Sequence, residues 1–291
     1  MLGLAVGDAL GAPREGCARD VEPPLAGMIG GGPFALPPGA WTDDTALALC
    51  LADSLLTDPA LDSADLLTRF RRWWERGENS ATGVGLGIGR TTFAALERFR
   101  ATGALIAEDS PAPASNGGIM RLAPVAIRFH AAPERAAAIA RAQSRTTHAA
   151  TAAVDAADLL ARILVAAIAG AGKAALSAHG ASLADPAIAA LAAGGWRGKG
   201  RDEITADGSA RATLEAALWC VGMAGDFPEA VLLAANLGGD ADTAAAIAGQ
   251  IAGAIWGAAA IPQTWLENLA KVAHITERAL RLYEAAGAPV F

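Results

Sequence analysis

Apolar residues recur along most of this chain every three or four positions, the spacing that places them on one face of an α-helix. No stretch shows sustained alternation of apolar and polar residues with β-branched side chains, so little or no sheet is expected. The pattern therefore predicts an all-α fold. The expected helices cover residues 1–10, 46–56, 62–76, 91–100, 147–168, 212–221, 228–236, 243–260 and 264–286, and a further helix begins at Pro133.

Capping and breaker residues refine the ends of these helices. Residues 264–267 read T-W-L-E, the pattern of a capping box, which predicts that the last helix begins there and continues unbroken. Glycine and proline gather between the helices in residues 16–40, while residues 107–118 and 194–208 also have loop composition. The first of these loops leads directly into an acidic cluster.

The composition supports a large helical core. Of the 291 residues, 53% are hydrophobic and only 18% are charged, and alanine, the strongest helix former, supplies much of the apolar share. The formal net charge of −7 argues against a nucleic-acid-binding protein, because such proteins normally carry a basic face.

The cysteines and the N-terminal residues bear on the compartment. Cys17, Cys50 and Cys220 show no paired spacing, which indicates reduced thiols in a cytoplasmic protein. No basic leader precedes an apolar run, so no signal peptide is expected. Residues 244–261 are uncharged, with glycine recurring every fourth position. Because alanine and glycine favour lipid weakly, we interpret this segment as a central bundle helix that packs closely, with no membrane contact.

Two short acidic clusters are the most informative chemical feature of the chain. Residues 41–45 read W-T-D-D-T and residues 236–243 read N-L-G-G-D-A-D-T. Each combines two carboxylates with flanking hydroxyls and runs directly into an apolar helix. These hard oxygen donors suit a hard divalent cation such as Mg²⁺ or Mn²⁺. If the fold brings the clusters together, they could hold two ions, as in two-metal hydrolytic sites.

Helix capping is the simpler explanation of either cluster alone. Thr and Asp are ordinary N-cap residues, and acidic groups in a first turn face the helix dipole favourably. Capping needs only one such residue, however, and two adjacent carboxylates repel each other. The same excess at both sites therefore favours a metal site. Because the clusters lie in opposite thirds of the chain, a shared site requires one compact domain spanning residues 1–291.

Three further polar segments accompany the clusters. Residues 7–11 read G-D-A-L-G and are followed by Glu15, while residues 115–121 read S-N-G-G-I-M-R. The glycines of the second segment would let backbone N–H groups approach a ligand, as in phosphate-binding loops. Residues 144–148 read S-R-T-T-H and are expected to open the helix over 147–168, whose free N-terminus can receive an anion.

Together and in this order, these segments resemble the ADP-ribosylglycohydrolase family. The matching stretches cover nearly the whole chain and read G-L-A-V-G-D-A-L-G-A-P-R-E, G-A-W-T-D-D-T, S-N-G-G-I-M-R, T-T-H, T-L-E-A-A-L-W and N-L-G-G-D-A-D-T. The resemblance implies a single all-α domain with two divalent cations at its centre, Mg²⁺ foremost and Mn²⁺ as the alternative. It also implies a hydrolase that cleaves the glycosidic bond between ADP-ribose and a modified side chain or small molecule.

Carried over to this sequence, the resemblance implies roles for particular residues. The attacking water would be activated by Asp43, Asp44 or Glu15, and the sequence leaves that choice open. The expected partner is ADP-ribose or an ADP-ribosylated protein, and we expect a monomer, with a dimer left open. The metal ligands would be Thr42, Asp43, Asp44, Asp240, Asp242 and Thr243, and the substrate contacts would be Asn116, Gly117, Gly118 and Met120, with His148 along the diphosphate.

The chain departs from the family pattern at two places, one of them before the T-L-E-A-A-L-W stretch, where some relatives carry a tyrosine and this chain has Ser209 and Ala210. Where many bacterial relatives carry an aspartate, this chain has Gly87, unless Asp109 or Glu78 supplies the carboxylate from a loop. Arginine-linked, serine-linked and free ADP-ribose derivatives therefore stay open as substrates. Two other functions also stay open. One is a protein of the same fold that binds ADP-ribose without turnover, in a structural or immunity role. The other is a two-metal nucleotide phosphatase, although it would lack the usual basic phosphate clamp.

Overall fold

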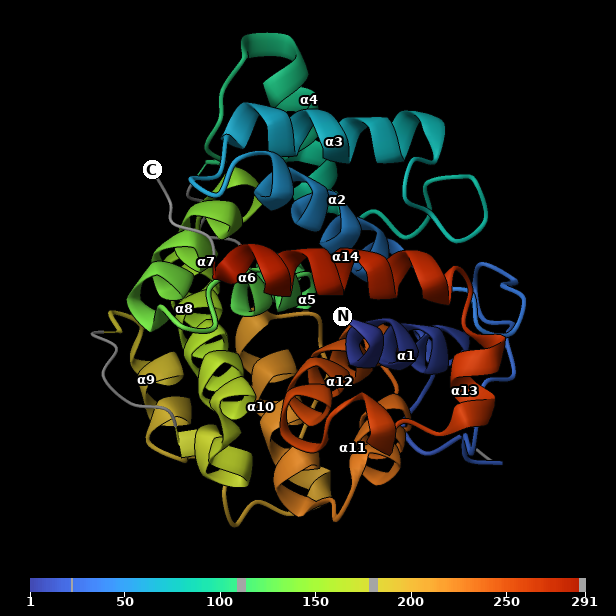
Figure 1. Cartoon of the computed structure of the whole chain (residues 1–291). Coiled ribbons are helices and arrows are strands. Elements are labelled where there is room, and N and C mark those ends of the chain that lie inside the picture. Colours follow the sequence, from blue (N-terminus) through green and yellow to red (C-terminus); the bar gives the residue numbers. More distant parts are fainter. Residues whose placement is uncertain (22, 109–113, 178–182, 288–291) are drawn as a thin grey trace.

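The helices of the structure follow the apolar periodicity of the sequence, and the predicted all-α fold is confirmed (Figure 1). The computed structural model describes residues 1–21, 23–108, 114–177 and 183–287, and these contain no strand beyond two isolated β-bridges. The α-helices are α1 (Leu2–Gly11), α2 (Asp43–Thr57), α3 (Ser63–Arg76), α4 (Arg90–Thr102), α5 (Gly117–Met120), α6 (Ala123–Arg128), α7 (Pro133–Thr147), α8 (Thr151–Ala166), α9 (Pro186–Ala192), α10 (Ala210–Met223), α11 (Phe227–Ala235), α12 (Ala241–Trp256), α13 (Gln263–Asn268) and α14 (Val272–Ala286).

Helices α1 and α12 pack side by side in the core, and their backbones touch. Gly3, Gly7 and Gly11 occupy successive turns of α1 on the side that faces α12. A Cβ atom at Gly7 would lie 2.0 Å from the carbonyl oxygen of Ala245, and one at Gly3 would lie 2.1 Å from that of Gly249. Only glycine permits so close an approach. The first helix of the chain and a helix from its last quarter are therefore held against each other.

The close packing predicted for residues 244–261 is confirmed at Gly249, where an added Cβ would lie 2.0 Å from the carbonyl oxygen of Gly3. Helix α12 ends earlier than predicted, at Trp256, because Gly257 adopts a φ of +79°. One helical stretch in the described part of the chain is long and apolar enough to cross a membrane by length and composition. It covers 151–177, outside α12, and 50% of its most apolar window is buried.

Asp8 connects α1 to the start of α2 through four hydrogen bonds. Its Oδ1 accepts from the backbone N–H and the hydroxyl of Thr42, both at 2.9 Å. Its Oδ2 accepts from the backbone N–H of Thr45 at 3.0 Å and from the hydroxyl at 2.7 Å. Thr42 is the N-cap residue of α2 but makes no capping bond with its own side chain. A carboxylate from another helix thus satisfies two of the free N–H groups at the start of α2 and places its first turn.

The prediction of a single helix over residues 264–286 is wrong. The structure has two helices there, α13 and α14, separated at Lys271, whose φ is +52°. No side chain caps α13, so the predicted capping box is wrong as well. The cause of the break is tertiary. The backbone N–H of Ala270 donates to the carbonyl oxygen of Gly39 (3.0 Å), and the carbonyl oxygen of Ala270 accepts from Nε1 of Trp41 (3.1 Å). These bonds replace helical ones and fasten the loop that carries the first acidic cluster.

The helix predicted to begin at residue 147 begins later, at Thr151. Residues 144–147 form the last turn of α7, and His148 is its C-cap, with its N–H donating to the carbonyl oxygen of Ser144 (2.6 Å). The hydroxyl of Ser144 donates in turn to the carbonyl oxygen of His148 (3.0 Å). His148 therefore lies at a helix C-terminus, and the predicted anion site at a helix N-terminus beginning there is wrong.

The contact between α1 and α12 predicts a strong effect of one methyl group. Gly7→Ala should lower the free energy of unfolding by about 3 kcal/mol or more, because the new Cβ meets backbone atoms that cannot move aside. Urea titration followed by circular dichroism measures the change. Gly27→Ala is the control, since a Cβ there would meet only Trp265 Nε1 at 3.6 Å. Equal stability of the two variants would contradict the packing described.

Candidate metal centre and adjoining cavity

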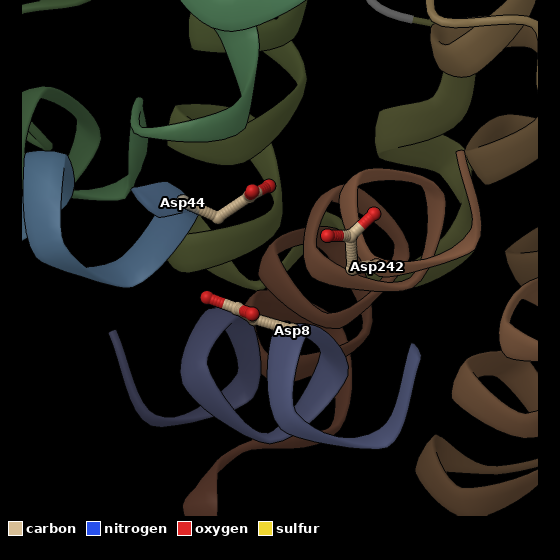
Figure 2. A group of neighbouring side chains, drawn as sticks. All are labelled: Asp8, Asp44 and Asp242. Atoms are coloured by element: carbon tan, nitrogen blue, oxygen red, sulfur yellow. The ribbon is translucent and has the colours of Figure 1, made fainter. Parts of the chain in front are cut away.

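Three buried aspartates from three helices meet at the centre of the molecule: Asp8 of α1, Asp44 of α2 and Asp242 of α12 (Figure 2). One carboxylate oxygen of each lies within 4.8 Å of those of the other two. The packing of α1 on α12 brings Asp8 near Asp242, and the bonds from Asp8 to the start of α2 add Asp44. The two acidic clusters of the sequence therefore come together in the fold.

The electrostatics of this cluster favour a bound cation. Burial raises the pKa of Asp44 and of Asp242 well above the usual range, and the neighbouring carboxylates raise both further. The Oδ1 atom of Asp44 is buried and accepts no hydrogen bond. A buried carboxylate with neither a donor nor a counter-charge is costly, so the cluster requires protons or a cation. Carboxylate and hydroxyl oxygens are the donors that Mg²⁺ and Mn²⁺ prefer, and the residues present fit such an ion.

Asp8 was not among the predicted site residues, and its hydrogen bonds give it a different role from Asp44. The four donors of Thr42 and Thr45 occupy the acceptor positions of its carboxylate. Because the Thr42 hydroxyl directs its proton to Asp8, oxygen lone pairs of Thr42 stay available to a cation. Asp8 therefore shapes the site, whereas Thr42, Asp44 and Asp242 keep oxygen atoms that can bind a metal ion. The glycines on α1 were the signal that this helix is buried with Asp8 facing inward.

A cavity of about 520 Å³ adjoins the cluster, a size typical of sites for small ligands. Thr42 and Asp44 are buried and do not line it, and Gly118 lies behind its wall against Ser144. The predicted site residues that do line the cavity are Glu15, Asp43, Gly87, Asn116, Gly117, Met120, His148, Asp240, Asp242 and Thr243.

Two consecutive glycines place the segment that carries Glu15. Gly238 and Gly239 both adopt positive φ, which lets the chain run against residues 16–18. The backbone N–H of Gly16 donates to the carbonyl oxygen of Gly239 (2.7 Å), and that of Gly239 donates to the carbonyl oxygen of Cys17 (2.9 Å). The G-G pair of the second acidic cluster thus serves a close contact between two chain segments.

Glu15 lies on the cavity wall, and its carboxyl group can gain or lose a proton near neutral pH. Burial, followed by the charges of Asp240 and Asp8, raises its pKa to about 7. Its Oε2 atom is buried and makes no hydrogen bond. A carboxylate with this pKa and a free oxygen can either accept or donate a proton.

Asn116 uses its side-chain amide within the protein. Its Nδ2 donates to Oδ2 of Asp240 (2.5 Å) and to Oγ1 of Thr213 (3.0 Å), and its backbone N–H donates to the carbonyl oxygen of Gly208 (3.2 Å). Both amide protons are therefore engaged. Asn116, which was predicted to contact substrate, lines the cavity and also orients Asp240.

Gly117 and Gly118 are required by side chains of α7. A Cβ atom at Gly117 would lie 2.4 Å from Cε1 of His148, and one at Gly118 would lie 2.3 Å from Oγ of Ser144. Neither glycine has a positive φ, and both belong to the short helix α5. In place of the predicted phosphate-type loop, the S-N-G-G segment thus forms a helix start that packs on the end of α7.

Several residues to which the sequence analysis assigned no role also line the cavity. Arg90 supplies a positive charge, and Asp207 supplies a further carboxylate. Residues far apart in the sequence meet here. For example, the hydroxyl of Ser115 donates to the hydroxyl of Thr91 (3.0 Å). No spacing in the sequence predicts such a contact. The group comprises Gly89, Arg90, Thr91, Thr92, Ser115, Asp207, Gly208 and Ser209.

Comparison with known proteins connects this arrangement to one family. A sequence model described as ADP-ribosylglycohydrolase matches residues 1–289. A protein named ADP-ribosylarginine hydrolase Tri1 from Pseudomonas putida (strain GB-1) is 42% identical over 287 residues, which cover 98% of this chain and 77% of the relative. A protein of the same name from Serratia proteamaculans (strain 568) is 41% identical over 285 residues, which cover 97% of this chain and 77% of the relative.

An ADP-ribosyl-[dinitrogen reductase] glycohydrolase from Rhodospirillum rubrum is 35% identical over 151 residues, which cover 50% of this chain and 49% of the relative. A solved structure described as an ADP-ribosylglycohydrolase-related protein complex superposes with a TM-score of 0.86 at 43% identity, covering 98% of this chain and 95% of that one. The two Tri1 proteins and the solved structure match this chain in sequence over nearly its full length. The solved structure also matches it in fold. The chain belongs to the ADP-ribosylglycohydrolase family and is a glycohydrolase.

Proposed function

We propose that this chain hydrolyses the bond between ADP-ribose and an arginine side chain, with two divalent cations held by its acidic clusters. The observation that carries the proposal is the meeting of two buried carboxylates, Asp44 and Asp242, beside a cavity of about 520 Å³, with Oδ1 of Asp44 accepting no hydrogen bond. Support for the arginine linkage comes from the two relatives named ADP-ribosylarginine hydrolase, at 42% and 41% identity.

The six predicted ligand residues keep the right chemistry for the two ions. Each offers a carboxylate or hydroxyl oxygen, and five are buried, Asp240 being half-buried. When bound, the ions would supply Lewis acidity toward the ribose hydroxyls and toward the attacking water. The residues that would hold them are Thr42, Asp43, Asp44, Asp240, Asp242 and Thr243.

Glu15 is the residue that we assign to proton transfer. A water oxygen bonds to the anomeric carbon of the distal ribose as the bond from that carbon to the guanidine nitrogen breaks. Glu15 accepts the proton that the water loses and returns it to the departing nitrogen, so that free ADP-ribose and arginine result. Its place on the cavity wall and its unpartnered Oε2 atom suit both steps. Asp43 and Asp44, the other candidates for the base, are left to bind metal.

The charges on the cavity wall suit the two ends of such a substrate. The carboxylates of Glu15 and Asp207, neither of them among the proposed metal ligands, favour a cationic guanidinium, which a serine-linked substrate would not carry. Arg90 offers a positive charge and His148 a ring nitrogen to the anionic diphosphate. This division of charge, together with the relatives, favours arginine over serine.

Gly87 lies at a point of the cavity wall where an aspartate would displace the carboxylate of Asp43. Its φ is +83°, and an added Cβ would lie 2.5 Å from Oδ1 of Asp43. Of the two residues considered as replacements for the family aspartate, Asp109 lies outside the described residues. Glu78 is exposed, pairs with Arg72 at 3.5 Å and does not line the cavity. Gly87 therefore gives no reason to favour a binding-only protein, and family membership removes the basis for the phosphatase alternative.

The first prediction concerns linkage and metal. With Mg²⁺ or Mn²⁺ present, the protein should release ADP-ribose from an arginine-linked ADP-ribosyl peptide, but not from a serine-linked one, and chelator should stop release. Asp44→Asn should lower kcat by at least about a hundredfold, because it weakens the cation site. Asp65→Asn, in the first turn of α3 and away from the cavity, is the control and should keep wild-type rates. Release that persists in chelator, or full activity of Asp44→Asn, would refute the proposal.

The second prediction concerns stability without metal. In the metal-free protein the pKa values of Asp43, Asp44 and Asp242 are raised well above normal, and that of Glu15 is raised from 4.5 to about 7. The folded state thus binds more protons than the unfolded state, so its stability is greatest at acidic pH and falls as pH rises through these pKa values. Melting in chelator should occur at a lower temperature at about pH 7.5 than at about pH 5, and added Mg²⁺ should restore the loss. Identical melting with and without Mg²⁺ at neutral pH would count against a cation in the cluster.

The third prediction concerns Gly87. Gly87→Asp should reduce kcat/KM, on the order of a hundredfold, because the new side chain displaces the carboxylate of Asp43 and adds a like charge beside it. Gly83→Ala is the matched control. Gly83 has a φ of +89° in the same loop, but an added Cβ meets no atom within 4 Å. Gly83→Ala should lose some stability and keep its rate. A gain of activity in Gly87→Asp would contradict the prediction, because it would show that the missing carboxylate matters more than the crowding of Asp43.

A further inference from the structure

His148 reaches the cavity from a buried position. Its side chain is only 5% exposed, yet it lines the cavity beside Gly117. The Nδ1 atom lies 2.8 Å from the hydroxyl oxygen of Thr147. The Nε2 atom makes no hydrogen bond to the residues that the structure describes, and it lies near the place where a Cβ on Gly117 would be, at 2.8 Å. The ring therefore turns one nitrogen to the protein and leaves the other toward the cavity wall.

The hydroxyl oxygen of Thr147 also accepts a hydrogen bond from Arg121, which does not line the cavity. Arg121, which is fully buried, donates from Nη2 to the hydroxyl oxygen of Thr147 at 2.7 Å. Arg121 is itself held by Gln143, whose Oε1 accepts from Nε at 2.9 Å, and its guanidinium lies 4.7 Å from the ring centre of Phe70. The guanidinium, the hydroxyl and the imidazole thus form one buried chain that ends at the cavity.

The direction of the hydrogen bonds along this chain follows from the available protons. A guanidinium can only donate, so Thr147 accepts from Arg121. Thr147 is fully buried, and among the described residues its hydroxyl meets no acceptor other than Nδ1 of His148. If Nδ1 carried the proton, the Thr147 hydroxyl would be left as a buried donor without a partner, which costs free energy. The hydroxyl therefore donates to Nδ1, and the ring proton of neutral His148 resides on Nε2.

We propose that Arg121 and Thr147 are positioning residues that hold His148 as the Nε2–H tautomer, so that it presents a hydrogen-bond donor to an anionic group of the ligand. The inference rests on the proposed function in that the anion is taken to be the diphosphate of ADP-ribose. Burial, followed by the charge of Arg121, lowers the pKa of His148 to about 3, which is consistent with a neutral ring. The role of His148 is then fixed by two residues that do not line the cavity of about 520 Å³ beside the acidic cluster.

The tautomer can be measured directly in the ligand-free protein. Two-bond ¹H–¹⁵N correlation spectra distinguish the two neutral forms of an imidazole, and the chain has only 4 histidines, so His148→Ala assigns the signal. We expect the Nε2–H pattern in the wild type and in Thr147→Ser, which keeps a hydroxyl. Thr147→Val, which has the same shape without the hydroxyl, should show the other tautomer or a mixture.

Thr146→Val is the matched control. Thr146 precedes Thr147 on α7 and is buried to a similar degree, but its hydroxyl donates to the carbonyl oxygen of Gln143 (2.7 Å) and does not touch His148. It should lose stability as a buried hydroxyl does, with an unchanged His148 signal. A change of tautomer in Thr146→Val as well would show that the signal reports general disturbance of α7.

Ligand binding tests the consequence. By calorimetry with ADP-ribose, Thr147→Val should bind about tenfold more weakly than the wild type, and Thr147→Ser should bind nearly as well. In the His148→Ala background, Thr147→Val should weaken binding no further, because the threonine acts through the histidine. An additive loss in the double variant would instead assign Thr147 a merely structural role.

Failure of this inference and failure of the proposed function give different results. An Nδ1–H signal in the wild type, or wild-type affinity for ADP-ribose in Thr147→Val, would overturn the positioning role even if arginine-linked ADP-ribose is hydrolysed. If the wild type does not bind ADP-ribose at all, the proposed ligand is wrong and the anionic partner assigned to His148 is overturned with it. Should Thr147→Val fail to fold, the wild-type spectrum and Thr147→Ser still decide the tautomer.

Discussion

The backbone contact between α1 and α12 is the constraint on which the rest of the structure depends. Because glycines replace side chains at this contact, the two helices approach closely enough to set Asp8 near Asp242. Asp8 then caps α2 from outside that helix and brings Asp44 to the same point. Two helices from the start of the chain and one from its last quarter thus meet at one cluster, and the cavity lies beside it.

That convergence has an electrostatic cost that either bound protons or a counter-charge must remove. Several carboxylates are taken out of water together, and burial and mutual repulsion raise the pKa of each. Four hydrogen bonds offset the cost of burying the Asp8 carboxylate, whereas Asp44 keeps an oxygen atom with no hydrogen-bond donor. The uneven distribution of donors separates a residue that builds the site from residues that have oxygens left to bind a cation.

The sequence predicted the fold class and most of the long helices because a period of three to four residues reports burial on one face, a local property. It failed where distant segments compete for backbone groups. Ala270 bonds to Gly39 and Trp41 and so divides the last helix, and His148 ends α7 where a new helix was expected to begin. Short helices such as α5 and α9 contain too few turns to show a period.

For the site, the sequence by itself determined which residues are candidates to carry the chemistry, since the paired acidic clusters exceed what helix capping requires and belong to a chain that matches one family over nearly its whole length. Only the tertiary structure decided what each neighbour does. It showed that Asp8 belongs with Asp44, that Asn116 holds Asp240, and that Gly87 lies too close to Asp43 for a side chain. The physical reason is that residue type follows from local chemistry, whereas hydrogen-bond partners and free space depend on segments that the sequence keeps far apart.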